Sequence, residues 1–210
     1  MRLLVITAVE AEAAAIGTHA DVVVVAGGVG RTNAACATTE AILRRGPFDG
    51  AINAGIAGAL PGAGLGIGDV VVASECVYVE EGIATPDGFL DMRGLRFALG
   101  DFEGNRVPVD PAMLAAIRGA FRSGPIATVA TCSGTDSAAA EVVRRTSALA
   151  EAMEGAAVVH AARRLGVPAI ELRAVSNSTG DRDRQQWDAK RAFAALGPAL
   201  REAIERLRAR

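Results

Sequence analysis

Aromatic residues make up only 4% of this 210-residue sequence, although half of its residues are hydrophobic. A core of this composition must be built from Ala, Val, Leu and Ile. Single α/β domains often reach this length, so we expect one domain over residues 1–210.

Cysteine and histidine are scarce as well. Cys36, Cys76 and Cys132 are odd in number and far apart, which fits neither a disulfide framework nor a metal site and favours a reducing cytoplasm. With only His19 and His160 beside them, we expect no bound metal. The sequence also lacks a P-loop and the G-x-G-x-x-G spacing, so we expect no cofactor.

Charge of one sign is not in excess, because 24 acidic residues nearly balance 22 basic ones. This balance does not point to a nucleic-acid partner. No apolar run approaches the ~20 residues of a membrane span, so no membrane partner is expected. The first apolar run is too short for a signal peptide and is followed at once by Glu10 and Glu12, which favours a first strand.

Apolar runs alternate with helix-like segments along the chain. We expect strands over residues 3–8, 22–26, 51–54, 70–79, 126–131 and 168–175. We expect helices over 31–45, 111–121, 137–145, 153–165 and 185–210, the last broken at Gly197-Pro198, and a Gly-rich loop over 55–68. This alternation predicts an α/β fold with a largely parallel sheet covered on both faces. Segment 80–108 has weak periodicity and is interpreted as a hairpin or insertion that covers a pocket or forms a subunit contact.

The last apolar run stops at Ser176-Asn177, and a polar loop follows. Ligands meet polar side chains at the carboxyl ends of strands in α/β proteins. The Asn177 amide both donates and accepts hydrogen bonds, as the edge of a 6-oxopurine requires.

Three acidic positions have both a structural and a functional interpretation. Glu10 and Glu12 follow the first strand, where the helix dipole favours acids, and for Glu10 we prefer that structural role. Glu154 opens a helix, yet its carboxylate is also suited to accept both hydroxyls of a ribose diol. The small residues of segment 53–58 form either a plain turn or a wall that lets a ligand approach the backbone.

The order of these elements resembles the nucleoside phosphorylase/nucleosidase superfamily, and in particular its hydrolytic branch, which includes methylthioadenosine/S-adenosylhomocysteine nucleosidase. The resemblance is carried by the segments Ala8-Val-Glu-Ala-Glu12, Gly27-Gly-Val-Gly30, Asn53-Ala-Gly-Ile-Ala-Gly58, Gly68-Asp-Val-Val-Val-Ala73, Ala152-Met-Glu-Gly-Ala156 and Arg173-Ala-Val-Ser-Asn177. It implies a three-layer α/β/α fold with a mixed, partly barrel-like central sheet. It also implies a homo-oligomeric enzyme that acts on a small-molecule nucleoside.

The resemblance implies roles for individual residues. Glu12 matches the acid that positions and deprotonates the attacking water, and Met153 and Glu154 match the ribose contacts. The base-pocket strand matches segment 131–135, which ends at Thr135. The wall beside the sugar matches Ala54, Gly55, Ile56, Ala57 and Gly58.

Asn177 departs from the adenine-specific nucleosidases, which carry Asp there. An Asn cannot protonate N7, but its NH₂ donates to N7 or O6 and mismatches a 6-amino group. Ser176-Asn177, the segment Gly180-Asp181-Arg182-Asp183-Arg184 and Trp187 resemble the futalosine hydrolase family. This implies cleavage of futalosine to hypoxanthine and dehypoxanthine futalosine in a menaquinone route.

Three alternatives stay open at this point. They are a purine nucleoside phosphorylase, with Arg31 as an anion contact, a methylthioadenosine/S-adenosylhomocysteine nucleosidase, and a non-catalytic nucleoside-binding protein. The aromatic carboxylate of futalosine also needs a cation or donor, for which the candidates are Arg93, Arg96, Arg106 and Arg182.

Overall fold

Strands rich in Val, Ile and Ala form the centre of the molecule. The computed structural model describes residues 1–209. Within this range one mixed sheet contains β1 (Leu3–Thr7), β2 (Val22–Ala26), β3 (Gly50–Ala59), β4 (Val70–Tyr78), β7 (Arg106–Pro108), β8 (Arg122–Thr128), β9 (Ala150–Ala152) and β10 (Ala169–Ser178). The core lies along this sheet: Leu3 and Ile6 of β1 are fully buried, because neighbouring strands and helices surround them.

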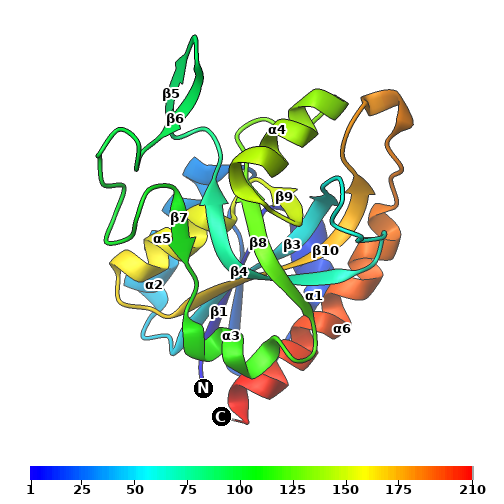
Figure 1. Ribbon diagram of the computed structural model, residues 1–210. Coiled ribbons are helices and arrows are strands. Elements are labelled where there is room, and N and C mark those ends of the chain that lie inside the picture. The colour runs from blue at the N-terminus through cyan, green and yellow to red at the C-terminus, as the bar shows by residue number, and fades with distance from the viewer. Residues whose placement is uncertain (210) are drawn as a thin grey trace.

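Part of the sheet closes on itself. β3 pairs with β10 and β9, β10 with β4, β4 with β8, and β8 with β9, so five strands form a closed ring (Figure 1). β1 and β2 extend the sheet from β3 in parallel. Because β10–β4 and β3–β9 are antiparallel while the other ring pairs are parallel, the mixed, partly barrel-like sheet is confirmed.

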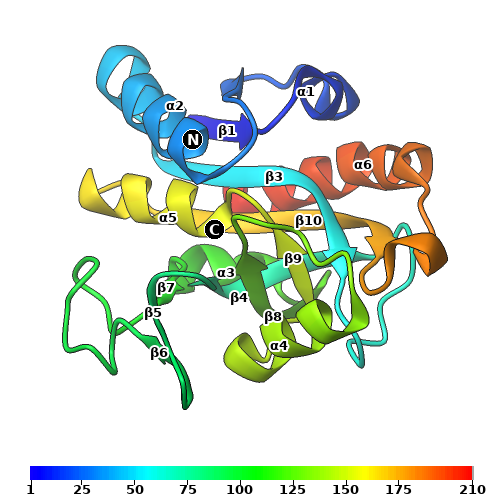
Figure 2. The ribbon, with the colours of Figure 1, turned by 90° about the horizontal axis from the view of Figure 1, so that it is seen from above.

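Helices cover both faces, as the α/β/α prediction requires. α1 (Glu10–Ile16) and α6 (Ala189–Arg208) pack together on one side, and α2 (Arg31–Arg45) and α5 (Gly155–Arg164) on the other (Figure 2). The remaining helical segments are α3 (Pro111–Ile117), α4 (Asp136–Thr146) and the 3₁₀ turn η1 (Arg182–Arg184). Among the described residues, none of the helices has the length and hydropathy needed to cross a bilayer.

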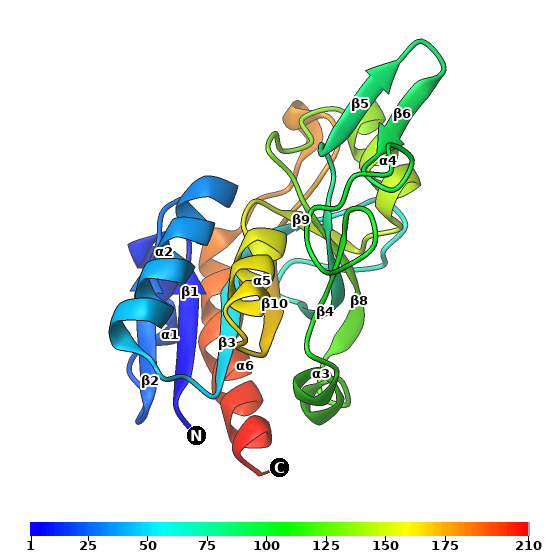
Figure 3. The same cartoon turned by 90° about the vertical axis from the view of Figure 1, so that its left-hand side faces the viewer.

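The weakly periodic segment contains a hairpin, as predicted. β5 (Gly82–Thr85) and β6 (Gly88–Asp91) pair only with each other in the described structure and project away from the barrel (Figure 3). Ile83 and Leu90 on this hairpin are about half exposed, and Phe97 behind it is 65% exposed.

Several predicted boundaries are wrong for reasons that lie in the tertiary structure. The loop expected from residue 55 is strand as far as Ala59, because β3 keeps pairing with β10 and β9. The strand expected to stop before Ser176 continues to Ser178, so Asn177 lies in β10. β8 starts at Arg122 instead of residue 126. Residues 150–152, for which no strand was predicted, form β9 just before α5.

The C-terminal helix is continuous where a break was expected. α6 begins at Ala189 and passes through Gly197 and Pro198 without ending. A Cβ on Gly197 would lie 2.5 Å from the carbonyl oxygen of Ala15 in α1, so the glycine serves close helix packing. The predicted cap of α3 is confirmed, since an Asp110 side-chain oxygen accepts from the Met113 N–H at 2.8 Å.

One irregularity interrupts the register between β3 and β10. Val175 lies opposite Ala57, but the next pair joins Asn177 to Gly58, so Ser176 is an extra residue in β10. Such a bulge re-aims the side chains that follow it.

Candidate active site

Glu12 bridges the end of β1 to the middle of β3. Its side chain is 2% exposed, whereas Glu10 on the same helical turn is exposed. Glu12 Oε2 accepts from the N–H groups of Ala8 at 2.8 Å and Val9 at 3.2 Å, and Oε1 accepts from the Ile56 N–H at 2.9 Å. Three backbone donors therefore fix the orientation of this carboxylate.

Arg173 of β10 brings a second carboxylate to the same place. Its side chain is 1% exposed, and Nη2 donates to Glu154 Oε2 at 3.2 Å and to Asn53 Oδ1. Glu154 Oε1 accepts from the Gly30 N–H at 3.0 Å, which ties α5 to the loop before α2. The Glu154 carboxylate is thus held from two sides and buried to 4% exposure.

Gly55 leaves room for the Glu12 and Arg173 side chains on the same part of β3. A Cβ at this position would lie 2.5 Å from Glu12 Oε1 and 2.6 Å from Arg173 Nη1. Any larger residue would separate the two groups. Ala54 beside it is fully buried, and the Ile56 N–H donates to Glu12. This part of β3 therefore packs against Glu12 and Arg173, which together with Glu154 we call the acid cluster.

A third carboxylate lies behind Arg173. Glu171 is fully buried, with Oε1 2.8 Å from Arg173 Nε and Oε2 accepting from Cys76 Sγ at 3.0 Å. Burial raises the pKa of both Glu171 and Cys76, while Arg173 opposes the shift in each. Burial disfavours the charge on Arg173, but Glu171, Glu154 and Glu12 outweigh it and raise the pKa of the guanidinium. Arg173 is therefore charged and is shared among these acids.

Asn177 lines a cavity of about 180 Å³ at the end of β10. The cavity is lined by Gly58, Cys132, Ser133, Gly134, Glu151, Asn177, Arg182, Gln185 and Trp187. Asn177 is 7% exposed; Oδ1 lies 2.8 Å from Ser176 Oγ, and Nδ2 donates to the Ser178 carbonyl at 2.9 Å. The amide carries two N–H donors, so one remains for a ligand.

The acid cluster and this cavity are neighbours along β3. Glu12 reaches the backbone at Ile56, and Asn177 pairs with Gly58, two residues further on. Two residues of a strand span about 7 Å, which matches the separation between the sugar and the outer edge of the base in a nucleoside. Glu12 and Glu154 do not line the Asn177 cavity itself. The two acids therefore belong to a site that lies next to this cavity along β3.

The other predicted site residues occupy different places. Met153 is half-buried, and its N–H lies 3.3 Å from Glu154 Oε2. Thr135 is exposed and caps α4 by accepting from the Ala138 N–H at 3.1 Å, so its hydroxyl serves the helix. Ala57 is buried next to Gly58.

The polar loop after β10 folds over the cavity. Trp187 pairs with Asn177 through an isolated bridge, and its ring lies 5.0 Å below the Arg182 guanidinium carbon. Gln185 accepts from Trp187 Nε1 at 2.9 Å and donates to the Ser133 carbonyl at 2.9 Å. An aromatic face and a cation therefore border the space beside Asn177.

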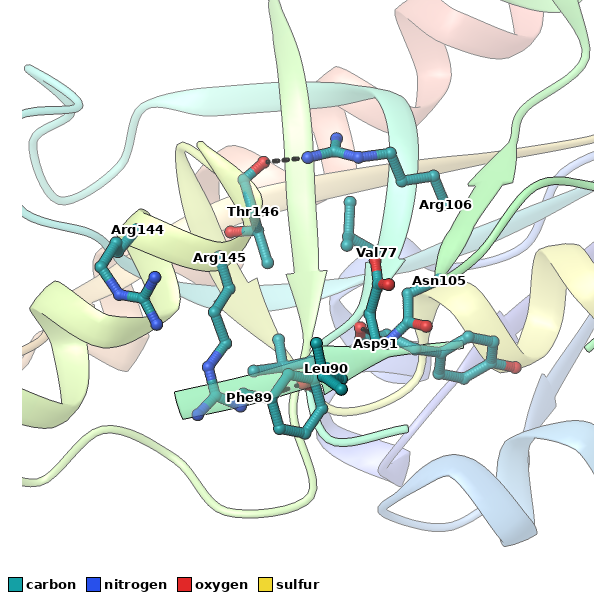
Figure 4. A pocket seen from close by; sticks show the side chains of 11 residues that line it. Val77, Phe89, Leu90, Asp91, Asn105, Arg106, Arg144, Arg145 and Thr146 are labelled. Carbon is teal, nitrogen blue, oxygen red and sulfur yellow. Dashed lines mark hydrogen bonds between the residues drawn. The ribbon is translucent and has the colours of Figure 1, made fainter. Parts of the chain in front are cut away.

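The candidate arginines in segment 80–108 lie apart from the acid cluster. Arg106 pairs with Glu75 and lines a second cavity of about 260 Å³ between β6, β7 and α4 (Figure 4). Arg145 stacks over Phe89 at 4.0 Å in the same cavity. Arg93 pairs with Glu103 at 3.0 Å. Of the four candidates, Arg182 is the one that borders the Asn177 cavity.

Sequence reasoning missed two buried acids. Glu171 and Arg173 are charged residues within the apolar first part of β10, and this interruption was a usable signal. Glu151 lies in β9, which is too short to show periodicity, and only its proximity to the Met153-Glu154 segment marked it.

A partly closed mixed barrel between helical layers, with buried acids beside a small polar cavity, defines an α/β enzyme of the phosphorylase type. Residues 6–208 match the family model described as phosphorylase superfamily, and the chain belongs to this superfamily. It is 38% identical to the futalosine hydrolase of Acidothermus cellulolyticus, over 95% of this chain and 91% of that protein. It is 39% identical to the futalosine hydrolase of Streptomyces coelicolor, over 83% of this chain and 75% of that protein.

A solved structure shares the fold. The 5'-methylthioadenosine/S-adenosylhomocysteine nucleosidase of Neisseria meningitidis, in complex with methylthio-immucillin-A, superposes with a TM-score of 0.80 at 24% identity, covering 97% of this chain and 98% of that one. This likeness confirms the predicted three-layer α/β architecture.

Proposed function

We propose that this chain hydrolyses the N-glycosidic bond of futalosine, releasing hypoxanthine and dehypoxanthine futalosine. The observation that carries the proposal is the residue at position 177, where an amide side chain, that of Asn177, and not a carboxyl, lines the cavity. Similarity to futalosine hydrolases over most of the chain supports the same substrate.

In the proposed mechanism Asn177 stabilises the departing base. Ser176 Oγ lies 2.8 Å from Asn177 Oδ1, which turns the NH₂ group toward other partners. As the glycosidic bond breaks, its electron pair goes to the 6-oxopurine, and the free N–H of Asn177 donates a hydrogen bond to N7 or O6 of the resulting anion. The anion then takes a proton from solvent to become hypoxanthine. One donor placed at a developing charge is worth roughly 3–4 kcal/mol in well-studied enzymes.

The two acids act on the sugar side. Glu154, which is held by Arg173 and the Gly30 N–H, accepts hydrogen bonds from the two hydroxyls of the ribose diol. Glu12 orients a water on the face of the ring opposite the base and takes its proton. Its three backbone contacts hold the carboxylate in one orientation for this step. Both roles are those that the resemblance implies for Glu12 and Glu154, and the hydrogen bonds described above support them.

Phosphorolysis is disfavoured by the charges around Arg31. Arg31 Nη1 lies 2.5 Å from Glu81 Oε1 and 3.5 Å from Glu80 Oε2, so two carboxylates already neutralise this cation. With Glu12 and Glu154 nearby, an incoming phosphate anion meets net negative charge. Neutral water meets no such barrier.

A chromatographic assay of base release tests the proposal. Futalosine, inosine, guanosine and methylthioadenosine are each incubated with the protein, with and without inorganic phosphate. We expect hypoxanthine from futalosine at a rate independent of phosphate, and little adenine from methylthioadenosine. Phosphate-dependent release indicates a phosphorylase, preferential adenine release indicates the methylthioadenosine alternative, and no release from any nucleoside indicates a binding protein; each result refutes the proposal.

We further propose that the enzyme works as a homo-oligomer in the cytoplasm. The exposed Ile83, Leu90 and Phe97 near the projecting hairpin support a subunit contact, because large apolar side chains gathered at a surface favour association. Light scattering of the purified protein tests it: a monomeric mass at micromolar concentration contradicts the proposal.

A further inference from the structure

We propose that Glu151 reads the N1–H of the 6-oxopurine from the side of the pocket opposite Asn177. This inference rests on the proposed function and adds the second half of the base-recognition site. Glu151 lines the same cavity as Asn177 and comes from a different strand, β9.

The sheet register sets the two side chains in one row. Asn177 of β10 pairs with Gly58 of β3, and Gly58 pairs with Glu151 of β9. Residues directly opposite one another on neighbouring strands point to the same face of a sheet. Two strand spacings separate the outer positions by about 10 Å, which is the width of a purine plus a hydrogen bond at each edge.

Gly58 leaves room for the Asn177 amide in the middle of the row. It has no side chain, and a Cβ there would lie 3.0 Å from Asn177 Nδ2 and 2.8 Å from the Thr179 methyl carbon. A side chain at position 58 would therefore displace the Asn177 amide from its place beside the strand that carries Glu151.

Glu151 is buried without a cation beside it among the contacts of residues 1–209. Its exposure is 4%, and both oxygens are held by Ser133, Oε1 by the N–H at 2.7 Å and Oε2 by the hydroxyl at 2.6 Å. Burial raises its pKa, the two Ser133 bonds oppose that shift, and Glu80 adds to it. A buried carboxylate with unused lone pairs is costly, so a ligand N–H donor would relieve it.

The chemistry of the base selects for this pair. A 6-oxopurine presents an N1–H donor beside the O6 acceptor, whereas adenine presents an N1 acceptor beside a 6-amino donor. A carboxylate at the N1 edge accepts from the first and repels the second. Glu151 and Asn177 thus both favour a 6-oxopurine over adenine. Adenine would leave polar groups of the pocket unpaired, which rejects a ligand more strongly than a misfit of shape does.

Calorimetric binding of free bases tests the inference. The wild type, Glu151→Gln and the control Glu202→Gln, at a half-buried position on α6 that pairs with Arg206, are titrated with hypoxanthine, 1-methylhypoxanthine and adenine. In Glu151→Gln we expect hypoxanthine affinity to fall about 10- to 100-fold, as for loss of a charged hydrogen bond. Discrimination against 1-methylhypoxanthine and adenine should shrink by a similar factor, and Glu202→Gln should match the wild type. An unchanged order of the three bases in Glu151→Gln overturns the inference.

A second variant covers failure of Glu151→Gln to fold. Ser133→Ala keeps the carboxyl and removes one of its two donors, so preference for hypoxanthine over adenine should weaken severalfold; an unchanged preference counts against Glu151. Base release from futalosine by the wild type, measured in parallel, separates the two proposals. Absence of release refutes the hydrolase, while the base-binding series judges Glu151 by itself.

Discussion

Replacing Glu12 by Gln tests the centre of the proposed mechanism. The change keeps the size of the side chain but removes its ability to take a proton from water. Loss of a general base typically lowers turnover by about 10²–10⁴-fold. Because the diol is held by Glu154 and the base by Asn177, KM for futalosine should change far less than kcat.

The structure also predicts a cost in stability for the same variant. Both Glu12 oxygens accept backbone N–H groups, from Ala8 and Val9 on one side and from Ile56 on the other. A Gln offers one oxygen, so at least one of these donors must face an NH₂ group. An unsatisfied buried donor costs about 1–3 kcal/mol. For a chain of this length that lowers the melting temperature by roughly 2–12 °C.

Hypoxanthine release from futalosine, followed by chromatography at saturating substrate, gives kcat, and thermal unfolding gives the melting temperature. Glu10→Gln is a matched control, since Glu10 lies on the same helical turn and is exposed. It should leave both quantities near the wild-type values. Near-wild-type turnover in Glu12→Gln would refute the general-base role, and an unchanged melting temperature would refute the hydrogen-bond argument.

Three further predictions follow from the site. Asn177→Asp should move the kcat/KM ratio from 6-oxopurine toward 6-aminopurine nucleosides, and an unchanged ratio in the base-release assay contradicts a role in reading the base. Gly155→Ala would place a methyl carbon 2.0 Å from a Glu171 oxygen, so its urea midpoint should fall by the equivalent of about 1–3 kcal/mol, whereas Gly119→Ala, with open space around it, should not. Burial raises the pKa of Glu151 above that of an ordinary Glu. Hypoxanthine should therefore bind with full affinity above this raised pKa and lose affinity as the pH falls through it. In calorimetry Glu151→Gln should not show this loss of affinity at acidic pH.

The sequence predicted most of the architecture, because β1 and β2 are short continuous apolar runs and α2 has helical spacing that ends at Gly46-Pro47. It failed where tertiary contacts override local signals. Small residues of β3 predict a turn, yet pairing on both sides keeps the chain extended to Ala59. Gly197-Pro198 predicts a helix break, yet the glycine serves contact with α1.

The site was predictable only in part. Glu12 and Glu154 follow recognisable strand or helix boundaries, and the structure brings both close to Arg173, with Glu12 and Arg173 meeting over Gly55. Thr135 was predicted from the resemblance as part of the base-pocket segment 131–135, and its hydroxyl accepts from the Ala138 N–H at the start of α4. Glu151 was missed: its nearness in sequence to Met153-Glu154 was the one local signal, and its position beside Asn177 depends on how three strands pair.

The extra residue in β10 has a consequence for how new specificities could arise. With uninterrupted pairing after Val175, a hydroxyl from Ser176 would stand across from Gly58 and the carboxamide of Asn177 would move on to Ala59. Loss of the bulge with both residues retained would therefore replace the carboxamide opposite Gly58 by a hydroxyl, whereas deletion of Ser176 itself would leave Asn177 opposite Gly58. Shifts in strand register, rather than point changes alone, offer this scaffold a route to different nucleobases.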